Sequence, residues 1–335
     1  EKKIRIFRCK TMGWRIKSTL SKKKGIIKMN KLSKEVFEKS KEYILNHGRE
    51  IDQKYYLFKL NKSNEEDFLG EIKKYQNEDG GFGHGIESDF WMPQSTPMAT
   101  TVGFQYLDKI SFEKSKLAAK KAINYLEKTY NIDRNGWFAA NSKINDYPHA
   151  PWWSYDEVKD RTPIDEFWGN PSAEIIGYLY KHKEFVKNLD IDKLIDKAVT
   201  NIREKNEFKS FHEIYCYISL YKNVDDEIKS KIKDRITQAV TELVETDRNK
   251  WFEYTPKPLD FISNPEMEKF GIKDKHINEN LDYLIENLEN SGRVNPNWEW
   301  GTYPDAWEKA KENWTVLLTV KAHILLDKFG RIEKF

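Results

Sequence analysis

A glycine turn in this sequence is followed at once by a histidine and two acids. The turn is Asp79-Gly80-Gly81-Phe82-Gly83, and His84, Glu87 and Asp89 come after it, with Trp91 behind them. Carboxylates and imidazole transfer protons, and glycines let a ligand approach the backbone closely. We therefore predict an acid–base or substrate-anchoring cluster at this stretch, with Trp91 contacting the substrate. The alternative is a capped, hydrogen-bonded loop without chemistry.

A third carboxylate, Glu174, interrupts the apolar start of a predicted helix that runs from Ala173 to Leu179. A carboxylate facing the protein interior has a pKa raised by desolvation, which suits a general acid. Alternatively, Glu174 is an acid in the first helical turn, where the helix dipole favours it. We predict Asp89, Glu87, Glu174 and His84 as the catalytic residues, with the structural alternative open for each.

Aromatic residues make up 14% of the chain, with eleven Trp, and an aromatic-lined cleft is one use for them. His149, Trp152 and Trp153 lie among prolines in a long segment without a helical pattern. They either wall a cleft, where indoles stack on a sugar or hold a cationic or polyene ligand, or plug the loop with apolar surface. Further substrate contacts are predicted at the mouth of such a cleft, at Trp298, Trp300, Tyr303 and Glu253.

A metal site is a further alternative. His212 and Cys216 are four positions apart, so they share a helix face and could bind zinc together with Glu213 or His276. A cysteine flanked by apolar and aromatic residues is more often a small core residue. We therefore predict no cofactor and keep zinc at His212 and Cys216 as the alternative.

The elements that must position these residues are helices. Apolar residues recur every three to four positions over 32–47, 65–75 and 112–130, and Gly48 ends the first of these stretches. A helix capped by Ser95, with Pro97 in its first turn, is expected to run to about Ile110. Further helices are expected over 190–205, 209–222, 225–246, 275–290 and 305–329. No stretch alternates like a strand, so the pattern predicts an all-α protein.

Two features lie outside this simple pattern. Residues 131–169 form a long segment without a predicted helix, and a structureless loop of that length is usually functional. It ends at Asn170 and Pro171, which are expected to cap and begin the next helix. In the last predicted helix, Trp307 and Trp314 are seven positions apart on one face, and we expect both in the core.

The polar turn before an aromatic residue recurs along the chain. Residues 133–138 and 247–252 repeat it, and residues 290–298 do so more loosely. The first two turns are 54 residues apart, and the next spacing, 114 residues, is about twice that. A unit of about 55 residues holds two helices and a turn, so five or six units give roughly ten to twelve helices that can close into a ring.

The stretch Gln76-x-x-Asp79-Gly80-Gly81-Phe82-Gly83 resembles the repeat motif of the superfamily of terpenoid cyclases and protein prenyltransferase β-subunits. The resemblance implies an α/α toroid, in which an inner ring of helices lies inside an outer ring. Residues 149–153 (His-Ala-Pro-Trp-Trp) and 170–174 (Asn-Pro-Ser-Ala-Glu) look like marks of a smaller bacterial branch. We therefore expect a single toroid domain over residues 29–335.

The catalytic signatures of that superfamily do not occur in the sequence. It has no Asp-x-Asp-Asp, as in squalene-type cyclases, and Asp225-Asp226 does not extend to Asp-Asp-x-x-Asp. Cys216 lacks the Asp two positions earlier that zinc-dependent prenyltransferases have. The implied fold therefore leaves the reaction open.

Three functions are compatible with these residues. The leading one is an isoprenoid-cyclase-like or prenyltransferase-like enzyme, holding an apolar or cation-forming substrate among Trp and Tyr, with Asp89, Glu87 or Glu174 as proton donor or base. The second is a glycoside hydrolase or polysaccharide lyase, with Asp89 and Glu174 facing each other across an open polar groove. The third is a non-catalytic binding scaffold whose carboxylates are held in salt bridges.

Charge separates the first residues from the rest. Residues 1–28 contain eleven Lys or Arg and one acid, which leaves 46 basic and 53 acidic residues beyond them, a net charge of −7. We expect the basic segment to be upstream of a true start at Met29 and outside the fold, and we expect no nucleic-acid partner for the acidic remainder. A nucleic-acid arm or a targeting peptide is the alternative. With only two Cys and no long apolar run, a cytoplasmic protein without a transmembrane segment is expected.

Overall fold

The computed structural model of the protein describes residues 29–334, which fold into twelve α-helices and five short 3₁₀ helices. The α-helices are α1 (Lys34–His47), α2 (Glu50–Lys59), α3 (Glu65–Lys73), α4 (Pro97–Leu107), α5 (Phe112–Lys128), α6 (Gly169–Lys181), α7 (Ile191–Arg203), α8 (Phe211–Asn223), α9 (Asp226–Leu243), α10 (Pro258–Phe261), α11 (Asp274–Ser291) and α12 (Pro304–Lys328). Outside the helices, this part of the chain has only isolated β-bridges. The all-α prediction is therefore confirmed.

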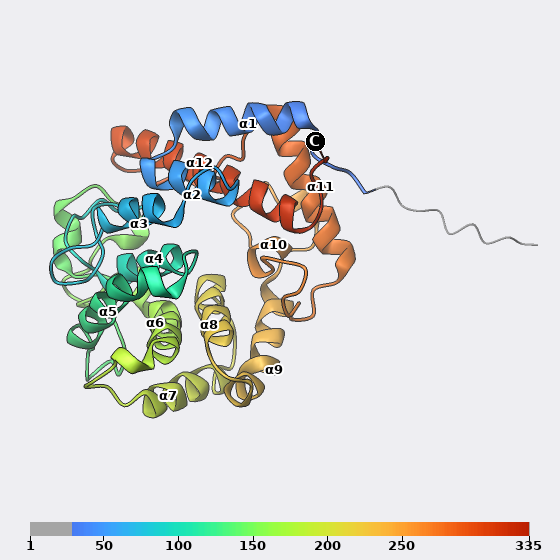
Figure 1. Ribbon diagram of the computed structural model, residues 1–335. Helices are drawn as coiled ribbons and strands as arrows, with labels where there is room; N and C mark the ends of the chain where they lie inside the picture. The colour runs from blue at the N-terminus through green and yellow to red at the C-terminus, as the bar shows by residue number, and fades with distance from the viewer. Residues whose placement is uncertain (1–28, 335) are drawn as a thin grey trace, which may run out of the picture.

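Neighbouring helices in the sequence are also neighbours in space (Figure 1). α2 packs on α3, α4 on α5, α6 on α7 and α8, α8 on α9, and α10 on α11. The last helix, α12, packs against α1 and α2, and the Leu32 amide donates to the Arg331 carbonyl at 2.8 Å. The two ends of the described chain therefore meet.

The helices α4, α6 and α8 are more deeply buried than their partners α5, α7 and α9. Nearly every residue of α4 and every residue of α6 from Gly169 to Leu179 is away from solvent, as expected of helices surrounded by protein. By contrast, α7 buries one stripe, at Leu194, Ile195, Ala198 and Ile202. Figure 1 shows α5, α7 and α9 on the outside of α4, α6 and α8.

Most predicted helices occur, with two corrections at their starts. α4 is capped by Thr96, whose hydroxyl accepts from the Ala99 amide at 2.9 Å, and not by Ser95. The Ser95 hydroxyl instead donates to Asp79 at 2.7 Å, which ties the glycine turn to the helix start. At α6, Asn170 has non-helical backbone angles, but its side chain faces Cys216 and makes no capping hydrogen bond. The short helices α2 and α10 were not predicted.

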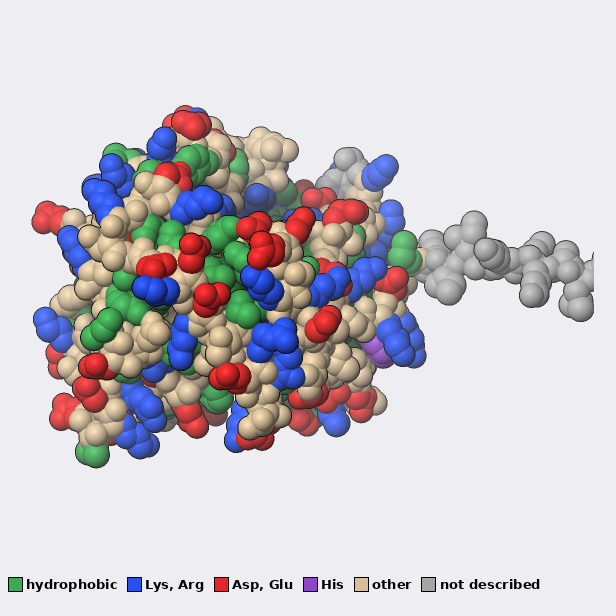
Figure 2. All heavy atoms as spheres, turned by 90° about the horizontal axis from the view of Figure 1, so that it is seen from below, with side chains coloured by type: hydrophobic (Ala, Val, Ile, Leu, Met, Phe, Trp, Pro, Cys, Tyr) green, Lys and Arg blue, Asp and Glu red, His purple; other side chains and the backbone are tan. Residues whose placement is uncertain are grey.

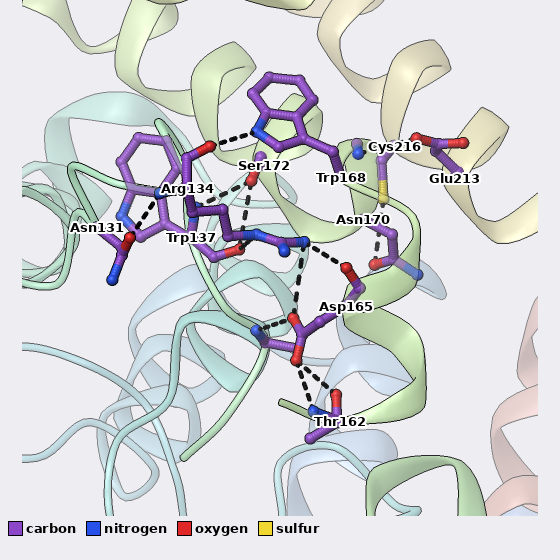
Figure 3. A network of polar contacts seen from close by, with 12 residues as sticks. Asn131, Arg134, Trp137, Thr162, Asp165, Trp168, Asn170, Ser172, Glu213 and Cys216 are labelled. Carbon is purple, nitrogen blue, oxygen red and sulfur yellow. Dashed lines mark hydrogen bonds and ion pairs between the residues drawn. The ribbon is translucent and has the colours of Figure 1, made fainter. Parts of the chain in front are cut away.

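The long segment 131–169 is ordered by its own polar contacts and contains the 3₁₀ helices η1 (Ser142–Asp146), η2 (Pro151–Trp153) and η3 (Pro163–Glu166). Figure 3 shows Arg134 reaching toward Asp165 across the segment. The guanidinium donates to the carbonyls of Trp137 and Asp165 at 2.9 and 2.8 Å. The Asp165 carboxylate accepts from the amides of Ala139 and Thr162 at 2.7 and 3.0 Å. The expectation of a structureless loop is therefore wrong.

The repeated turns are anchored by their aromatic residues. Phe82, Trp137 and Trp251 are each at most 1% exposed. The indoles of Trp137 and Trp251 also donate to backbone carbonyls, both at 2.8 Å. In the first turn, Gly80 has φ +95°, and a Cβ there would lie 2.3 Å from the Lys121 carbonyl oxygen, so only glycine fits. The repeated turns therefore have a structural role, because their aromatic residues anchor them to neighbouring parts of the fold.

The surface of the described chain mixes charges of both signs. Figure 2 shows Lys and Arg side chains interspersed with Asp and Glu over one face of the molecule. Within residues 29–334, no helix combines the length and the apolar character that crossing a bilayer requires. The basic segment 1–28 lies outside the described residues, so its assignment stays a prediction.

Candidate functional site

A cavity of about 570 Å³ lies among the buried helices. The first turns of α4, α6 and α8 contribute to its wall, together with α10, α11 and the stretch of α12 from Trp314 to Leu325. Its volume is in the range of small-molecule sites. The cavity is therefore the candidate site.

Three of the carboxyl groups that line this cavity form no ion pair among the described residues: Glu87, Asp89 and Glu174. Among the described residues, no Lys, Arg or His lies within ion-pair distance of any of them; their partners are neutral donors. Buried carboxyl groups without a cation are costly to ionise, so they keep protons to higher pH than usual. These three carboxyl groups can thus donate or accept protons in a reaction.

Asp89 lies among tryptophan side chains. Its Oδ1 accepts from the indole Nε1 of Trp300 at 2.9 Å and of Trp314 at 2.6 Å. Burial raises the pKa of Asp89, while the indole donors oppose the rise by stabilising the carboxylate. Trp298 also faces the cavity, but its Nε1 completes no hydrogen bond with any described residue. Two indoles therefore hold Asp89.

Glu87 is the more strongly perturbed member of the pair. Burial raises its pKa, and the neighbouring charge of Asp89 raises it further. Its Oε1 accepts from the Asp89 backbone amide at 3.1 Å, so the two residues form one local turn. Because Asp89 has two indole donors and Glu87 has none, Asp89 is the more easily ionised of the two carboxyl groups.

Glu174 projects from α6 and is 8% exposed. Its Oε1 accepts from Tyr178 at 2.9 Å and from Gln105 at 3.1 Å. Burial raises the pKa of Glu174, and these donors oppose the rise only in part. The Glu174 carboxyl group is thus bound to side chains of α4 and α6.

The loop that carries Glu87 and Asp89 is fixed by a residue outside the predicted set. The Arg49 guanidinium donates to the carbonyls of Gly85 and Ile86 at 2.9 and 3.2 Å, directly before Glu87. Arg49 is itself paired with the buried Asp52 at 2.7 Å. Asp52 also accepts from Tyr106 on α4 at 2.8 Å. A buried ion pair therefore clamps the carboxyl loop to α2 and α4.

The stretch that carries Glu87 and Asp89 lies beside the stretch that carries His149, Trp152 and Trp153. Phe90 pairs with His149 in a β-bridge, the Ala150 amide donates to the Asp89 carbonyl at 2.8 Å, and the Trp91 amide donates to Pro148 at 3.0 Å. This pairing brings Trp152 and Trp153 to the same cavity as the carboxyl groups. Trp153 also packs edge-on against Phe90, with ring centres 5.1 Å apart.

The predicted site residues divide into two groups. Those in the cavity wall are Glu87, Asp89, Glu174, Trp152, Trp153 and Trp298. Those outside it are His84, Trp91, His149, Glu253, Trp300 and Tyr303. Trp300 nevertheless serves the site through its bond to Asp89.

The remaining residues have structural surroundings. His84 is exposed and bonds Asn77 at 2.8 Å. The His149 ring lies between the Tyr147 carbonyl and the Ser154 hydroxyl, at 2.7 and 3.0 Å. These contacts correspond to the alternative in which His149 anchors the loop. Glu253 and Tyr303 are exposed. His84 therefore does not join the carboxyl groups.

His212 and Cys216 both line the cavity but turn to different partners. His212 Nε2 lies 2.8 Å from the Tyr254 hydroxyl, whereas Cys216 Sγ lies 3.6 Å from Asn170 Oδ1. Burial raises the pKa of the Cys216 thiol, so it is a poor source of thiolate. Within residues 29–334, no three His, Cys, Asp or Glu side chains are grouped to hold a metal ion.

Several functional residues were missed in the sequence. Arg49 precedes a helix that the pattern did not show, and Trp314 reads as a core residue from its spacing with Trp307. Lys257, Asp260 and Lys321 line the cavity as well, with Asp260 and Lys321 paired at 2.8 Å. The four-residue helix α10 that holds Asp260 is too short for a periodic signal.

Comparisons with protein-family models, with curated proteins and with solved structures find no match to this chain. Its function is therefore inferred from the cavity and the side chains that line it.

Proposed function

We propose that the protein is an acid–base enzyme that acts on a small, mainly apolar molecule through a cationic intermediate, as terpenoid cyclases do. The observation that carries the proposal is a group of three carboxyl residues, half-buried Glu87 and buried Asp89 and Glu174, that line one cavity without an ion-pair partner among the described residues. Nine aromatic side chains share the wall with them. Proton donors beside aromatic faces suit a substrate that becomes positively charged.

The architecture that we propose is an α/α toroid. Three observations support it: α4, α6, α8, α10, α11 and α12 line the cavity, α5, α7 and α9 lie outside α4, α6 and α8, and α12 returns to α1. In such a ring the segments before the inner helices gather at one end. The segment before α4 carries Glu87 and Asp89, and the one before α12 carries Trp298 and Trp300, so both reach the same mouth.

The proposed chemistry uses the unequal surroundings of two neighbouring acids. Glu87, kept neutral by burial, donates its proton to an alkene carbon, and the new C–H bond leaves a carbocation on the adjacent carbon. Aromatic faces and the Asp89 carboxylate stabilise that charge. Loss of a proton from the cation to a carboxylate restores an alkene, so the net change is isomerisation or cyclisation. Glu174 is placed to take that proton, because its own buried carboxylate lacks a cation.

The amide side chains in the wall favour an apolar ligand over a sugar. Asn280 accepts from the Leu259 amide at 3.0 Å, and Asn287 donates to the Tyr283 carbonyl at 2.9 Å. Gln105 is bound to Glu174. With these amides engaged, aromatic rings provide much of the surface left for a ligand, beside the carboxyl groups, Lys257 and Asn295. A saccharide needs many more free hydrogen-bonding groups per unit of surface.

Carbohydrate cleavage is the second candidate, and one arrangement favours it. Carboxyl groups from two separate elements, the loop before α4 and α6, line the same cavity near Trp152 and Trp153. Glycosidases use such pairs, one as acid and one as base or nucleophile. In this case Glu174 and Asp89 take those two roles and the indoles stack on the sugar ring.

The deciding experiment compares both ligand classes on the same variants. Farnesol and cellobiose are titrated against the protein while Trp fluorescence is followed, and products from isoprenoid and oligosaccharide mixtures are measured with Glu87→Gln, Asp89→Asn and Glu174→Gln. We expect quenching by farnesol, and turnover reduced by about 10²-fold or more in each variant. Glu253→Gln, an exposed acid, is the matched control. Binding with no turnover by any form would make the protein a scaffold.

A further inference from the structure

Lys257 is a cavity residue that the proposed acid–base chemistry does not use. It directly precedes α10, is half-buried, and lines the cavity beside Leu259, Asp260 and Lys321. A lysine in a largely aromatic wall requires an explanation, because an ammonium group is costly to keep away from water without a partner.

The carboxylate nearest to Lys257 in the chain is already engaged. Asp260 Oδ1 accepts from the Lys321 ammonium at 2.8 Å, and Oδ2 accepts from the backbone amide of Lys257 at 2.9 Å. Among the described residues, the only hydrogen-bond partner of the Lys257 amine is the Thr255 carbonyl, at 3.4 Å. Lys257 therefore has a second cation as a neighbour and no ion pair of its own.

The burial of Lys257 favours its neutral form. Burial lowers its pKa, the charge of Asp260 opposes that effect, and the positive charge of Lys321 again lowers the pKa. A lysine that is desolvated and placed next to another cation is the environment in which this side chain becomes a nucleophile at neutral pH. The neutral amine has the lone pair that attack on a carbonyl carbon requires.

We propose that Lys257 forms an imine with an apolar aldehyde or ketone held in the cavity. The amine nitrogen attacks the carbonyl carbon, the C–N bond forms, and the carbonyl oxygen leaves as water with the two amine hydrogens. No electrons are exchanged, and hydrolysis reverses the step. The apolar remainder of the ligand lies against the aromatic wall near Tyr254 and Trp298. The inference rests on the same cavity as the proposed function, but not on its carboxyl groups.

The test is reductive trapping on the full chain. The protein is incubated at pH 7 with 3-phenylpropanal and sodium cyanoborohydride, and the modified lysines are located by peptide mapping at short times. We expect Lys257 to be labelled at least severalfold faster than Lys193, whose side chain is 84% exposed, because a lowered pKa leaves a larger fraction of free amine at pH 7. Labelling of Lys257 no faster than of Lys193 would overturn the proposal.

Two further variants test whether the charge of Lys321 controls the reactivity of the Lys257 amine. Lys321→Gln removes the neighbouring cation and releases Asp260 to pair with Lys257, so labelling should slow at least severalfold, while Lys321→Arg keeps the charge and the rate. Equal rates in both variants would contradict the proposed cause. Glu87→Gln should lose turnover and keep labelling at Lys257, so failure of the acid–base proposal and failure of this one give different results.

Discussion

Trp314, in the middle of the last helix, donates its indole hydrogen to Asp89 Oδ1 at 2.6 Å, across 225 positions of sequence. The contact links α12 to the loop before α4. A side chain of α12 therefore stabilises the ionised form of Asp89. Trp314 also packs edge-on against Trp298, with ring centres 5.2 Å apart. The indole thus has both a polar and an apolar partner at the cavity wall.

Replacing Trp314 by Phe should shift the titration of Asp89 to higher pH. The indole hydrogen bond stabilises the carboxylate, so its loss raises a pKa that burial has already raised. We also expect a loss of about 2 kcal/mol in the free energy of unfolding, as for a hydrogen bond to a charged group. Trp307→Phe, in the same helix and without contact to Asp89, is the control for packing. Equal shifts of the pH–activity profile in both variants would refute this role.

Removing the charge of Arg49 should destabilise the protein strongly. Arg49→Gln leaves Asp52, which has no exposed side-chain surface, as an unpaired buried carboxylate. Breaking one side of such a pair costs about 3–5 kcal/mol, measured by urea unfolding. The double variant Arg49→Gln/Asp52→Asn should recover part of that loss. Lys74→Gln, at an exposed pair with Glu50, should leave the urea midpoint nearly unchanged.

Stability should fall with pH between about 6.5 and 4 because of His323. This ring bonds Ser40 at 2.6 Å and Tyr56 at 2.7 Å in the packing between α1, α2 and α12. Burial lowers the pKa of His323 to about 4, so the unfolded chain takes up the proton first as the pH falls. Stability is then full above pH 6.5 and lost toward pH 4, by about 3 kcal/mol.

Unfolding measured across that pH range in His323→Gln tests the assignment. The variant should start less stable at pH 7 and show a shallower decline, since no buried imidazole remains to be protonated. His47→Gln, at an exposed histidine, should keep the slope of the parent. If the stability of His323→Gln fell with pH as steeply as that of the parent protein, other groups would be the cause of the acid sensitivity.

The order of segment 131–169 should depend on the Asp165 carboxylate. In Asp165→Asn, one of the two oxygens becomes a donor facing the amides of Ala139 or Thr162, which need acceptors. We expect a loss of about 1–3 kcal/mol and faster amide hydrogen exchange between residues 134 and 165. Glu166→Gln, one position later, is the control. Unchanged exchange in Asp165→Asn would show that packing alone orders the segment.

The sequence predicts the helices well where many residues repeat one period, as in α5 and α9, but not the four-residue α10, which is too short to show one. It also identifies Glu87 and Asp89, because they follow a glycine turn, and Glu174, because it interrupts an apolar helix start. It cannot show their partners. Trp307 and Trp314 look equivalent at a spacing of seven, yet only Trp314 meets Asp89, since that contact depends on how the distant loop folds over α12. Arg49 was missed for the same reason.

The meeting of Leu32 with Arg331 has a consequence for how the protein is made. A nascent chain leaves the ribosome from its amino end, so α1 is exposed long before α12 exists to cover it. The apolar face of α1, with Phe37 and Ile44, must wait until α12 has been synthesised. The described residues therefore complete their fold only after α12 has left the ribosome, and a ribosome-bound chain halted before α12 should still bind chaperones at α1.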